Sequence, residues 1–386
     1  MLAPKAVDAT VRTRAAPHQG RAKRVATRGN TGVAARGALR MAHLVPTFIH
    51  HRMFPLRRNV VTVPQHARQL DVVDLSKVKA ALQRRMQLMA EQLYMRKTFV
   101  IVNGKGGVGK SSLSAAIAVA LSKLGLRVLL MEMDEQGNNC EDLCITGTVL
   151  DDGGQAQAAA ILDGKPLVPT GEARPNLWVI PGGSALEAVV EELYCQRRLA
   201  RHSDSPQDQL AWMGMYAAAL DQIRDDFDVI ILDVAPGSEP LQLQALVAGD
   251  MIVVPSKSDP SSRKGLRTVA SRYAKARSLN PMLRLLGVVV FATNSTATRV
   301  QATIKRHLVA DLNGAARVFD QVIRHVESAA VACRTQGKAP QEMVSDPDLD
   351  PAQRASMRAL AGDYQSLAME VLQAKTDLDS EGHHAA

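Results

Sequence analysis

The sequence predicts an α/β fold in which helices flank a mostly parallel β-sheet. From residue 98 onward, short runs rich in β-branched and apolar residues alternate with segments of helical periodicity, the pattern of strand–helix–strand units. The first run is followed at once by a glycine-rich turn and an alanine-rich helix, an order typical of ligand-binding parallel sheets. With 386 residues, 46% of them hydrophobic, the chain can form one large domain with additional segments, or two domains.

The other elements follow the same alternation along the chain. We expect strands at 98–102, 127–134, 178–180, 228–233, 250–255, 286–293 and 318–323. We expect helices at 75–96, 113–121, 184–226 (with a polar break at 202–208), 298–312 and 350–374. The segment 145–176, rich in Gly and Pro, is expected to be a loop or an insertion, and the residues after Lys375 a disordered tail.

The turn after the first strand contains Asn-Gly-Lys-Gly-Gly-Val-Gly-Lys-Ser-Ser at 103–112, which fits the pattern GxxxxGKS/T. Between a strand and a helix, this pattern is the phosphate-binding loop of the P-loop NTPases. The glycines let backbone N–H groups approach phosphate oxygens, and the start of the helix adds its positive dipole end. Lys110 supplies a charge for the β- and γ-phosphates, and the Ser111 hydroxyl can coordinate Mg²⁺. The predicted nucleotide-binding residues are Gly104, Lys105, Gly106, Gly107, Val108, Gly109, Lys110, Ser111 and Ser112.

Basic residues are concentrated in the first 60 positions. Twelve of the 47 Lys and Arg residues lie there with Asp8 as the one acidic residue, although the net charge of the whole chain is +9. This acid-poor leader without periodicity is predicted to be disordered. Its role stays open: no specific role, a basic arm that adds non-specific DNA affinity, an organelle transit peptide, or residues ahead of the true start codon.

The composition also indicates the cellular compartment of the protein. Four cysteines in a chain of this length do not form a disulfide framework, and Cys140 with Cys144 lacks the second pair of ligands that a zinc site needs. The apolar run at 285–292 has the length of a strand and is far too short to span a membrane. Near the first residues there is no apolar core of a secretory signal. We therefore expect a cytoplasmic protein.

Lys105 makes the phosphate loop unusual. The run Lys-Gly-Gly-Val-Gly-Lys-Ser at 105–111 resembles the deviant Walker A motif of the ParA/MinD family, P-loop NTPases of the SIMIBI-like type. The resemblance spans about residues 98–340 and implies an ATPase that binds ATP with Mg²⁺. It also implies that Lys105 reaches across a dimer interface to the phosphates of the partner subunit, so that two ATP molecules lie between two subunits.

A second motif follows the second predicted strand. Residues 132–138, Glu-Met-Asp-Glu-Gln-Gly-Asn, are similar to the family signature Asp-x-Asp-Pro-Gln-Gly-Asn. The resemblance implies that Asp134 positions or activates the attacking water. Glu132 and Glu135 depart from the signature, because they stand where the family has aspartate and proline. Neither change removes the expected catalytic carboxylate.

The third motif is an apolar run that ends at Asp233. It has the Walker B pattern, whose carboxylate holds Mg²⁺ through a water molecule, and residues 233–237 resemble the family's γ-phosphate-sensing switch. In the family an asparagine near the end of a later strand contacts the adenine, which implies this role for Asn294. The expected catalytic residues are Lys105, Lys110, Asp134 and Asp233, and the expected magnesium residues are Ser111 and Asp233.

The resemblance also suggests how the chain is divided and what it does. The expected parts are the leader at 1–60, a linker with an amphipathic helix at 61–97, the ATPase domain at 98–345, and C-terminal helices with a tail at 346–386. The implied function is DNA partition by a ParA-type ATPase: ATP binding forms a sandwich dimer that binds DNA non-specifically and associates with the nucleoid. A ParB-like centromere-binding protein then stimulates ATP hydrolysis.

Two basic segments, 256–277 and 298–312, are candidates for contacts to DNA phosphates, although solvated helix faces carry similar charge. The alternative function is that of a MinD-like positioning or regulatory ATPase, which acts through a protein or membrane partner without a DNA role. A MinD-like basic amphipathic helix is not expected at the C-terminus, because that segment contains several acidic residues. We therefore expect no stable membrane association. The cysteine positions do not match an iron–sulfur ATPase of this family.

Overall fold

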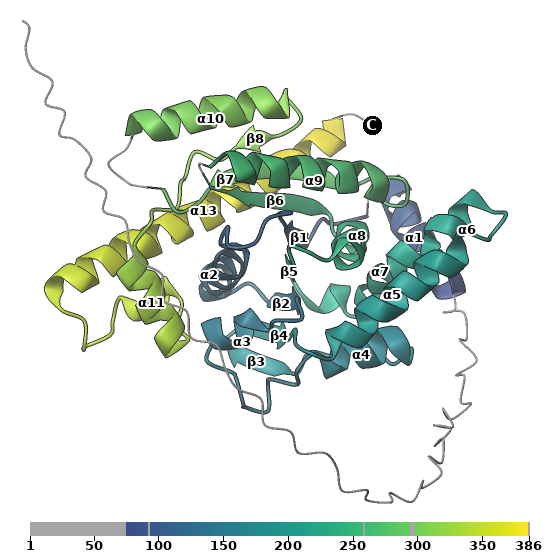
Figure 1. Cartoon of the computed structure of the whole chain (residues 1–386), viewed down its shortest axis with the longest axis horizontal. Helices are drawn as coiled ribbons and strands as arrows, with labels where there is room; N and C mark the ends of the chain where they lie inside the picture. Colours follow the sequence, from purple (N-terminus) through teal and green to yellow (C-terminus); the bar gives the residue numbers. More distant parts are fainter. Residues whose placement is uncertain (1–74, 92, 258, 294–297, 385–386) are drawn as a thin grey trace, which may run out of the picture. The chain divides into compact units, whose positions relative to one another are not determined.

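The computed structural model describes residues 75–91, 93–257, 259–293 and 298–384 (Figure 1). Within these ranges, the strands form one sheet in the order β3-β4-β2-β5-β1-β6-β7-β8. All neighbours are parallel except β3 and β4, which are antiparallel. The strands are β1 (Thr98–Ile101), β2 (Val128–Met133), β3 (Gly171–Arg174), β4 (Leu177–Ile180), β5 (Val229–Val234), β6 (Met251–Ser256), β7 (Arg284–Val290) and β8 (Arg317–Val318). The predicted fold class is confirmed, whereas the leader at 1–60 and Asn294 lie outside the described residues.

Helices cover both faces of this sheet, as Figure 1 shows. One face carries α2 (Lys110–Lys123), α3 (Asn138–Asp142), α11 (Glu327–Gln336), α12 (Pro340–Met343) and α13 (Pro351–His384). The other carries α1 (Leu75–Ala90), α4 (Gln155–Leu162), α5 (Leu186–Ala200), α6 (Pro206–Ala211), η1 (Trp212–Gly214), α7 (Met215–Asp221), η2 (Arg224–Asp226), α8 (Glu239–Ala248), α9 (Pro260–Ala276) and α10 (Thr298–Leu312).

The central strands are buried on both faces, which explains their nearly continuous apolar sequences. Alternate residues of a strand point to opposite faces, so each strand contributes to two separate cores. In β1, Phe99 and Ile101 pack in the core beneath α2, and Val100 packs in the core beneath α8. Among the helices in the described part of the chain, none is both long enough and apolar enough to cross a membrane.

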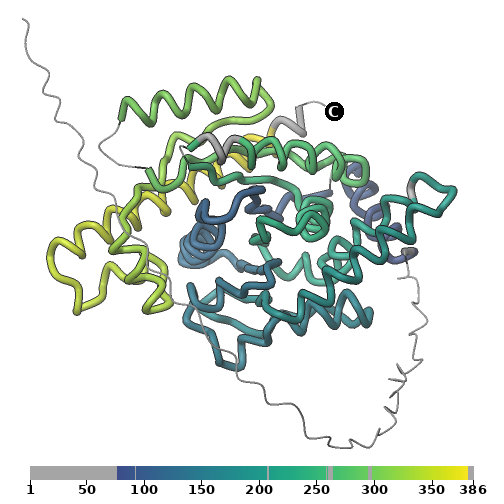
Figure 2. The backbone as a smooth tube through the Cα atoms, viewed as in Figure 1, coloured from purple at the N-terminus to yellow at the C-terminus, as the bar shows by residue number. Residues whose placement is uncertain are grey.

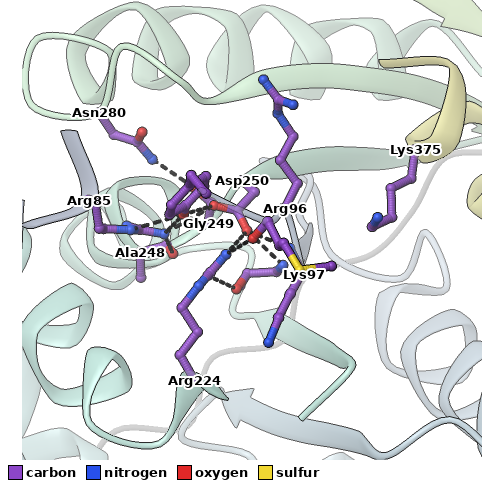
Figure 3. A network of polar contacts seen from close by, with 12 residues as sticks. Arg85, Arg96, Lys97, Arg224, Ala248, Gly249, Asp250, Asn280 and Lys375 are labelled. Carbon is purple, nitrogen blue, oxygen red and sulfur yellow. Dashed lines mark hydrogen bonds and ion pairs between the residues drawn. The ribbon is translucent and has the colours of Figure 1, made fainter. Parts of the chain in front are cut away.

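Helix α1 ends at Ala90, six residues before the predicted end. The reason is a buried polar network around Asp250 at the start of β6 (Figure 3). Arg85 of α1 donates to the carbonyl oxygens of Val247 and Ala248, at 3.0 and 2.8 Å, and pairs with Asp250 at 3.1 Å. The Tyr94 hydroxyl also donates to Asp250. Since this contact turns the chain back toward the sheet, the helix cannot continue to residue 96.

The segment 145–176 is not a simple loop, because it contains α4 and β3. Helix α4 consists largely of alanine and glutamine, and its small apolar residues pack in the core although their periodicity is weak. Strand β3 is visible only through its antiparallel pairing with β4. The predicted strand at 318–323 is limited to β8, which has two residues.

The prediction of a disordered tail after Lys375 was wrong, because α13 runs on to His384. Figure 2 shows its long path across the molecule, and it packs against α2, α12 and β7. Ion pairs stabilise its final turns: Lys375 with Asp379 at 2.8 Å, Arg96 with Asp379 at 2.9 Å, and Arg317 with Asp377 at 3.2 Å. The partners Arg96 and Arg317 come from distant parts of the sequence, so local periodicity could not reveal them.

Candidate nucleotide-binding site

The phosphate loop connects β1 to α2 and depends on its glycines. Gly107 and Gly109 have φ angles of 68° and 86°, in the left-handed region that favours glycine. A Cβ atom on Gly109 would lie 2.1 Å from Cε1 of Phe291, so that side chain packs directly on the loop. Asn103 fastens the start of the loop to β6 by donating from Nδ2 to the carbonyl oxygen of Pro255 at 2.7 Å. The loop is therefore held in shape from both ends.

Helix α2 begins at Lys110 without a side-chain cap. Helices α6 and α8 are capped differently, because Ser205 and Ser238 accept hydrogen bonds from backbone N–H groups of their first turns. The first N–H groups of an uncapped helix need an outside acceptor, and a phosphate group is well suited to them. The local geometry of α2 is thus that of an anion-binding helix start.

A cavity of about 610 Å³ lies over this loop. At one end it is lined by Gly107, Gly109, Lys110, Ser111, Ser112 and Asp134. Toward the segment after β8 it is lined by Ala292, Ile323, Arg324, His325, Val326, Leu360 and Tyr364, and Phe291, which packs on Gly109, is also part of the lining. Of the other predicted site residues in the described chain, Gly104, Lys105, Gly106, Val108 and Asp233 do not line it. In the sheet order β2 and β8 lie on opposite sides of β1, so the lining extends from the loop and the end of β2, its phosphate end, to the segment after β8.

Lys110 and Asp233 meet beneath the phosphate end. Burial lowers the pKa of Lys110, and the neighbouring carboxylates of Asp233 and Asp134 oppose this shift. Asp233 is 1% exposed, and burial raises its pKa to about 6, against the lowering effects of the Ser111 hydroxyl and the Lys110 ammonium. These groups lie together because β5 pairs with β1, with Asp233 opposite Ile101 just before the loop.

One oxygen of Asp233 is incompletely satisfied. Its Oδ2 accepts a hydrogen bond from Nδ2 of Asn139 at 2.9 Å. Its Oδ1 is buried and has no hydrogen-bond partner of regular geometry among the described residues. A buried carboxylate oxygen beside the Ser111 hydroxyl is a donor set that suits Mg²⁺ or water bound to Mg²⁺. The residues present therefore fit the predicted magnesium site.

Asp134 directly follows β2 and lies at the phosphate end of the cavity. Its Oδ1 accepts from the backbone N–H of Gln136 at 3.0 Å, and its carbonyl oxygen accepts from Gly183 at 3.0 Å. A Cβ atom on Gly182 would lie 2.2 Å from that carbonyl oxygen, so the turn after β4 packs tightly on Asp134. This packing fixes the backbone of Asp134, and the hydrogen bond from Gln136 orients its carboxylate.

Sequence reasoning missed the part played by Asn139 and Glu132. The register of β2 and β5 places Glu132 opposite Asp233, and Oε2 of Glu132 accepts from the backbone N–H of Asn139 at 3.1 Å. Asn139 thus connects two buried carboxylates, since its side chain donates to Asp233. Burial, followed by the charge of Asp233, raises the pKa of Glu132 well above its usual range. The only sequence signal was the departure from aspartate at position 132.

Lys105 points away from the cavity in the single chain. Its Nζ forms an ion pair with Oδ1 of Asp259, between β6 and α9, at 2.8 Å. Its backbone N–H donates to Oδ1 of Asn103 at 2.9 Å, which orients the residue at the start of the loop. A Cβ atom on Gly104 would meet Thr268 of α9 at 2.8 Å, so the loop also packs against α9.

The basic segments divide into paired and exposed residues. Arg272 of α9 donates to Gln242, Lys275 pairs with Glu239 at 3.7 Å, and Arg277 donates to the carbonyl oxygen of Pro281 at 3.1 Å. Several of the charges in 256–277 therefore serve packing. The exposed basic residues of the two segments include Lys264, Arg267, Arg299 and Arg306.

Comparison with known sequences points to one family. The family model described as an AAA domain matches residues 96–285. The chain is 30% identical over 240 residues to the chromosome partitioning protein ParA of Caulobacter vibrioides, covering 59% of this chain and 80% of that protein. It is 28% identical over 216 residues to the chromosome-partitioning ATPase Soj of Thermus thermophilus, covering 55% and 76% of the two chains.

Solved structures of the same fold include two proteins with low sequence identity. An ATP complex of a Cyanothece McdA variant has a TM-score of 0.57 at 19% identity, covering 72% of this chain and 96% of that one. The structure of pNOB8 ParA has a TM-score of 0.51 at 18% identity, covering 73% and 99%. At these identities the similarity concerns the fold.

Proposed function

The chain is an ATPase of the ParA/MinD family, and we propose that it acts in DNA partition through an ATP-dependent dimer. The observation that carries the proposal is the phosphate end of the cavity. There an uncapped helix start, the buried Lys110 and Asp134 line the cavity, and Asp233 lies beneath them next to Lys110. We propose 98–345 as the ATPase domain and ATP with Mg²⁺ as its ligands.

The residues of the site divide the proposed work among them. Backbone N–H groups of the loop and α2, with Lys110, hold the phosphates of ATP. Ser111 and Asp233 would hold Mg²⁺, Asp233 through a water molecule, and the ion would neutralise developing phosphate charge. The neighbouring residues Gly104, Gly106, Val108 and Ser112 complete the loop.

Hydrolysis requires a water molecule in line with the γ-phosphate. Asp134 is a carboxylate at the cavity wall that accepts a hydrogen bond from the backbone N–H of Gln136, and we assign to it the orientation of this water. Lys110 offsets the charge that develops on the transferred phosphoryl group. The base would occupy the end of the cavity near the segment after β8.

Dimerisation enters the proposal through Lys105. In the single chain this lysine pairs with Asp259, and in the proposed dimer it exchanges that partner for a phosphate of the ATP bound to the other subunit. The exposed basic residues of α9 and α10 are the surface we assign to non-specific DNA phosphates. A ParB-like protein would stimulate hydrolysis and release the ATPase from the nucleoid.

The proposal is tested by binding to a random-sequence DNA duplex in the presence of ATP, ADP or no nucleotide. Asp134→Ala holds the ATP state by blocking hydrolysis, and Lys110→Ala is the variant without nucleotide. We expect DNA binding in the presence of ATP but not with ADP or without nucleotide. It should be strongest for Asp134→Ala and absent for Lys110→Ala. Binding that ignores nucleotide in all three proteins would contradict the partition function and favour the alternative, a positioning ATPase without a DNA role.

A further inference from the structure

Helix α13 presents three carboxylates at seven-residue spacing, a distance of about two turns that keeps them on one face. They are Asp363, Glu370 and Asp377. Asp363 and Glu370 bind the segment between β8 and α11, whereas Asp377 binds Arg317 of β8 at 3.2 Å. The first two carboxylates therefore act on a different part of the molecule from the third.

Asp363 makes an unusually complete set of contacts. Its Oδ2 accepts from the backbone N–H of Arg324 at 3.0 Å and from Nε of the same residue at 2.6 Å. Its Oδ1 accepts from Nη2 of Arg324 at 2.7 Å and from Nε2 of Gln321 at 3.2 Å. Asp363 is 6% exposed, so this bidentate pair is largely shielded from water.

Glu370 holds the preceding residues of the same segment. Its two oxygens accept from the backbone N–H groups of Asp320 and Gln321, at 2.6 and 2.9 Å. On its other side, the segment is bonded to the end of β7: Ile323 N–H donates to Val290 at 3.0 Å, and His325 N–H donates to Thr293 at 2.8 Å. A segment without regular structure is thus held from two sides.

This segment forms the end of the nucleotide cavity away from the phosphate loop, where Ile323, Arg324, His325 and Val326 line it. The carboxylates are not needed to attach α13 itself, because its buried residues Leu367, Val371 and Ala374 already pack in the core. Their contacts instead fix the backbone of the cavity wall. A wall that is ordered before binding costs less entropy when the ligand arrives.

We propose that Asp363 and Glu370 are positioning residues that fix the base-side wall of the cavity, so that affinity for the nucleoside depends on helix α13. The proposal rests on the proposed function in one respect, that the cavity holds ATP with its base at this end. It adds that the C-terminal helix and the nucleotide are coupled, although the phosphate-binding residues lie elsewhere.

The test compares two ligands that share phosphates and differ in the nucleoside: ATP and inorganic tripolyphosphate, each with Mg²⁺. Dissociation constants are measured by calorimetry for the full-length protein and for Asp363→Asn, Glu370→Gln and Asp377→Asn. We expect Asp363→Asn to weaken ATP about tenfold, or ~1.4 kcal/mol, and Glu370→Gln about threefold. Tripolyphosphate binding should be unchanged in both variants, and the matched control Asp377→Asn should bind both ligands as the unmodified protein does.

A purely structural role would lower the affinity for both ligands equally, and this result would overturn the proposal, as would unchanged ATP binding. Recovery of ATP affinity in Asp363→Glu would support the proposal, because that variant restores the carboxylate. If Asp363→Asn does not fold, Glu370→Gln alone decides, since its contacts are to backbone N–H groups at a less buried position. Failure of the unmodified protein to bind either ligand would instead refute the nucleotide site.

Discussion

Asp233 and Asp250 are equally buried, each with 1% of its surface exposed, yet they have opposite surroundings. Asp233 lies near the carboxyl end of β5, and Asp250 immediately precedes the amino end of β6. These two strands flank β1. Asp250 pairs with Arg85 and Arg224, as Figure 3 shows. It also accepts hydrogen bonds from the Tyr94 hydroxyl and from the start of β1. Burial alone would raise the pKa of Asp250, but these partners lower it to about 2.

Asp233 has weaker partners: a hydrogen bond from Asn139, with the Ser111 hydroxyl and the Lys110 ammonium nearby. Burial raises its pKa to about 6, and its Oδ1 lacks a regular hydrogen bond within the described residues. A buried carboxylate is costly unless other groups compensate its charge. The protein itself compensates Asp250, which is the sign of a structural role. For Asp233 the compensation from Lys110, Ser111 and Asn139 is incomplete and leaves Oδ1 unsatisfied among the described residues, which is the sign of a functional role.

The largest effect that this comparison predicts is on stability. Asp250→Asn leaves the two buried guanidinium groups of Arg85 and Arg224 without a counter-charge, so we expect a loss of about 3–5 kcal/mol in the free energy of unfolding. Urea denaturation measures the loss. The matched control is Asp225→Asn, because Asp225 is 80% exposed and pairs weakly with the same region, and it should change stability by less than about 1 kcal/mol. If both substitutions lowered the free energy of unfolding equally, Asp250 would not have the structural role that we assign to it.

The second prediction concerns activity. Asp233→Asn keeps the hydrogen bond from Asn139 within reach but removes the charge that would face Mg²⁺, so we expect kcat for ATP hydrolysis to fall about 100-fold. The stability of the nucleotide-free protein should change by less than about 1 kcal/mol, because the Asp233 carboxylate is only partly compensated and Lys110 keeps Asp134 as a neighbouring carboxylate. Steady-state ATPase assays and urea denaturation together check both parts. A large loss of stability with little loss of kcat would assign Asp233 the role we give to Asp250.

A smaller effect is predicted for the dependence of stability on pH. The folded-state pKa of Asp250, about 2, is below the ordinary value of 3.8, so its contribution to stability is complete above about pH 4 and is lost as the pH falls toward 2. The shift corresponds to about 2 kcal/mol. Denaturation curves at a series of acidic pH values should show the difference between the unmodified protein and Asp250→Asn narrowing over this window. A constant difference would show that Asp250 is not the titrating group.

The same contrast explains what could be predicted from the sequence. The phosphate loop, Asp134 and Asp233 belong to short motifs at the ends of apolar strands, so residue type and order were enough to find them and to expect a parallel sheet. The Asp250 network joins Asp250 to Arg224, 26 positions away, and to Arg85, 165 positions away, and no local pattern indicates which arginine meets which carboxylate. The helical end of α13 was missed for the same reason.

The base-side wall was also beyond sequence reasoning. It is assembled from Phe291, the segment after β8 and residues of α13, which meet only once the sheet and its covering helices have formed. The ion pair of Lys105 with Asp259 and the bridging role of Asn139 likewise depend on tertiary contacts. Local motifs therefore predict the phosphate end of the cavity, and topology determines the rest.

The most direct test of the account is thermal unfolding with ATP, in the presence of Mg²⁺ or of a chelator. It compares the unmodified protein, Asp233→Asn and Lys110→Ala, because a ligand that binds the folded state raises the melting temperature. For the unmodified protein we predict that ATP raises the melting temperature more with Mg²⁺ than with the chelator. For Asp233→Asn the increase should be the same with and without Mg²⁺, and for Lys110→Ala there should be no increase. If Asp233→Asn keeps the full Mg²⁺-dependent increment, the unsatisfied oxygen of Asp233 does not mark the magnesium site, and the central claim fails.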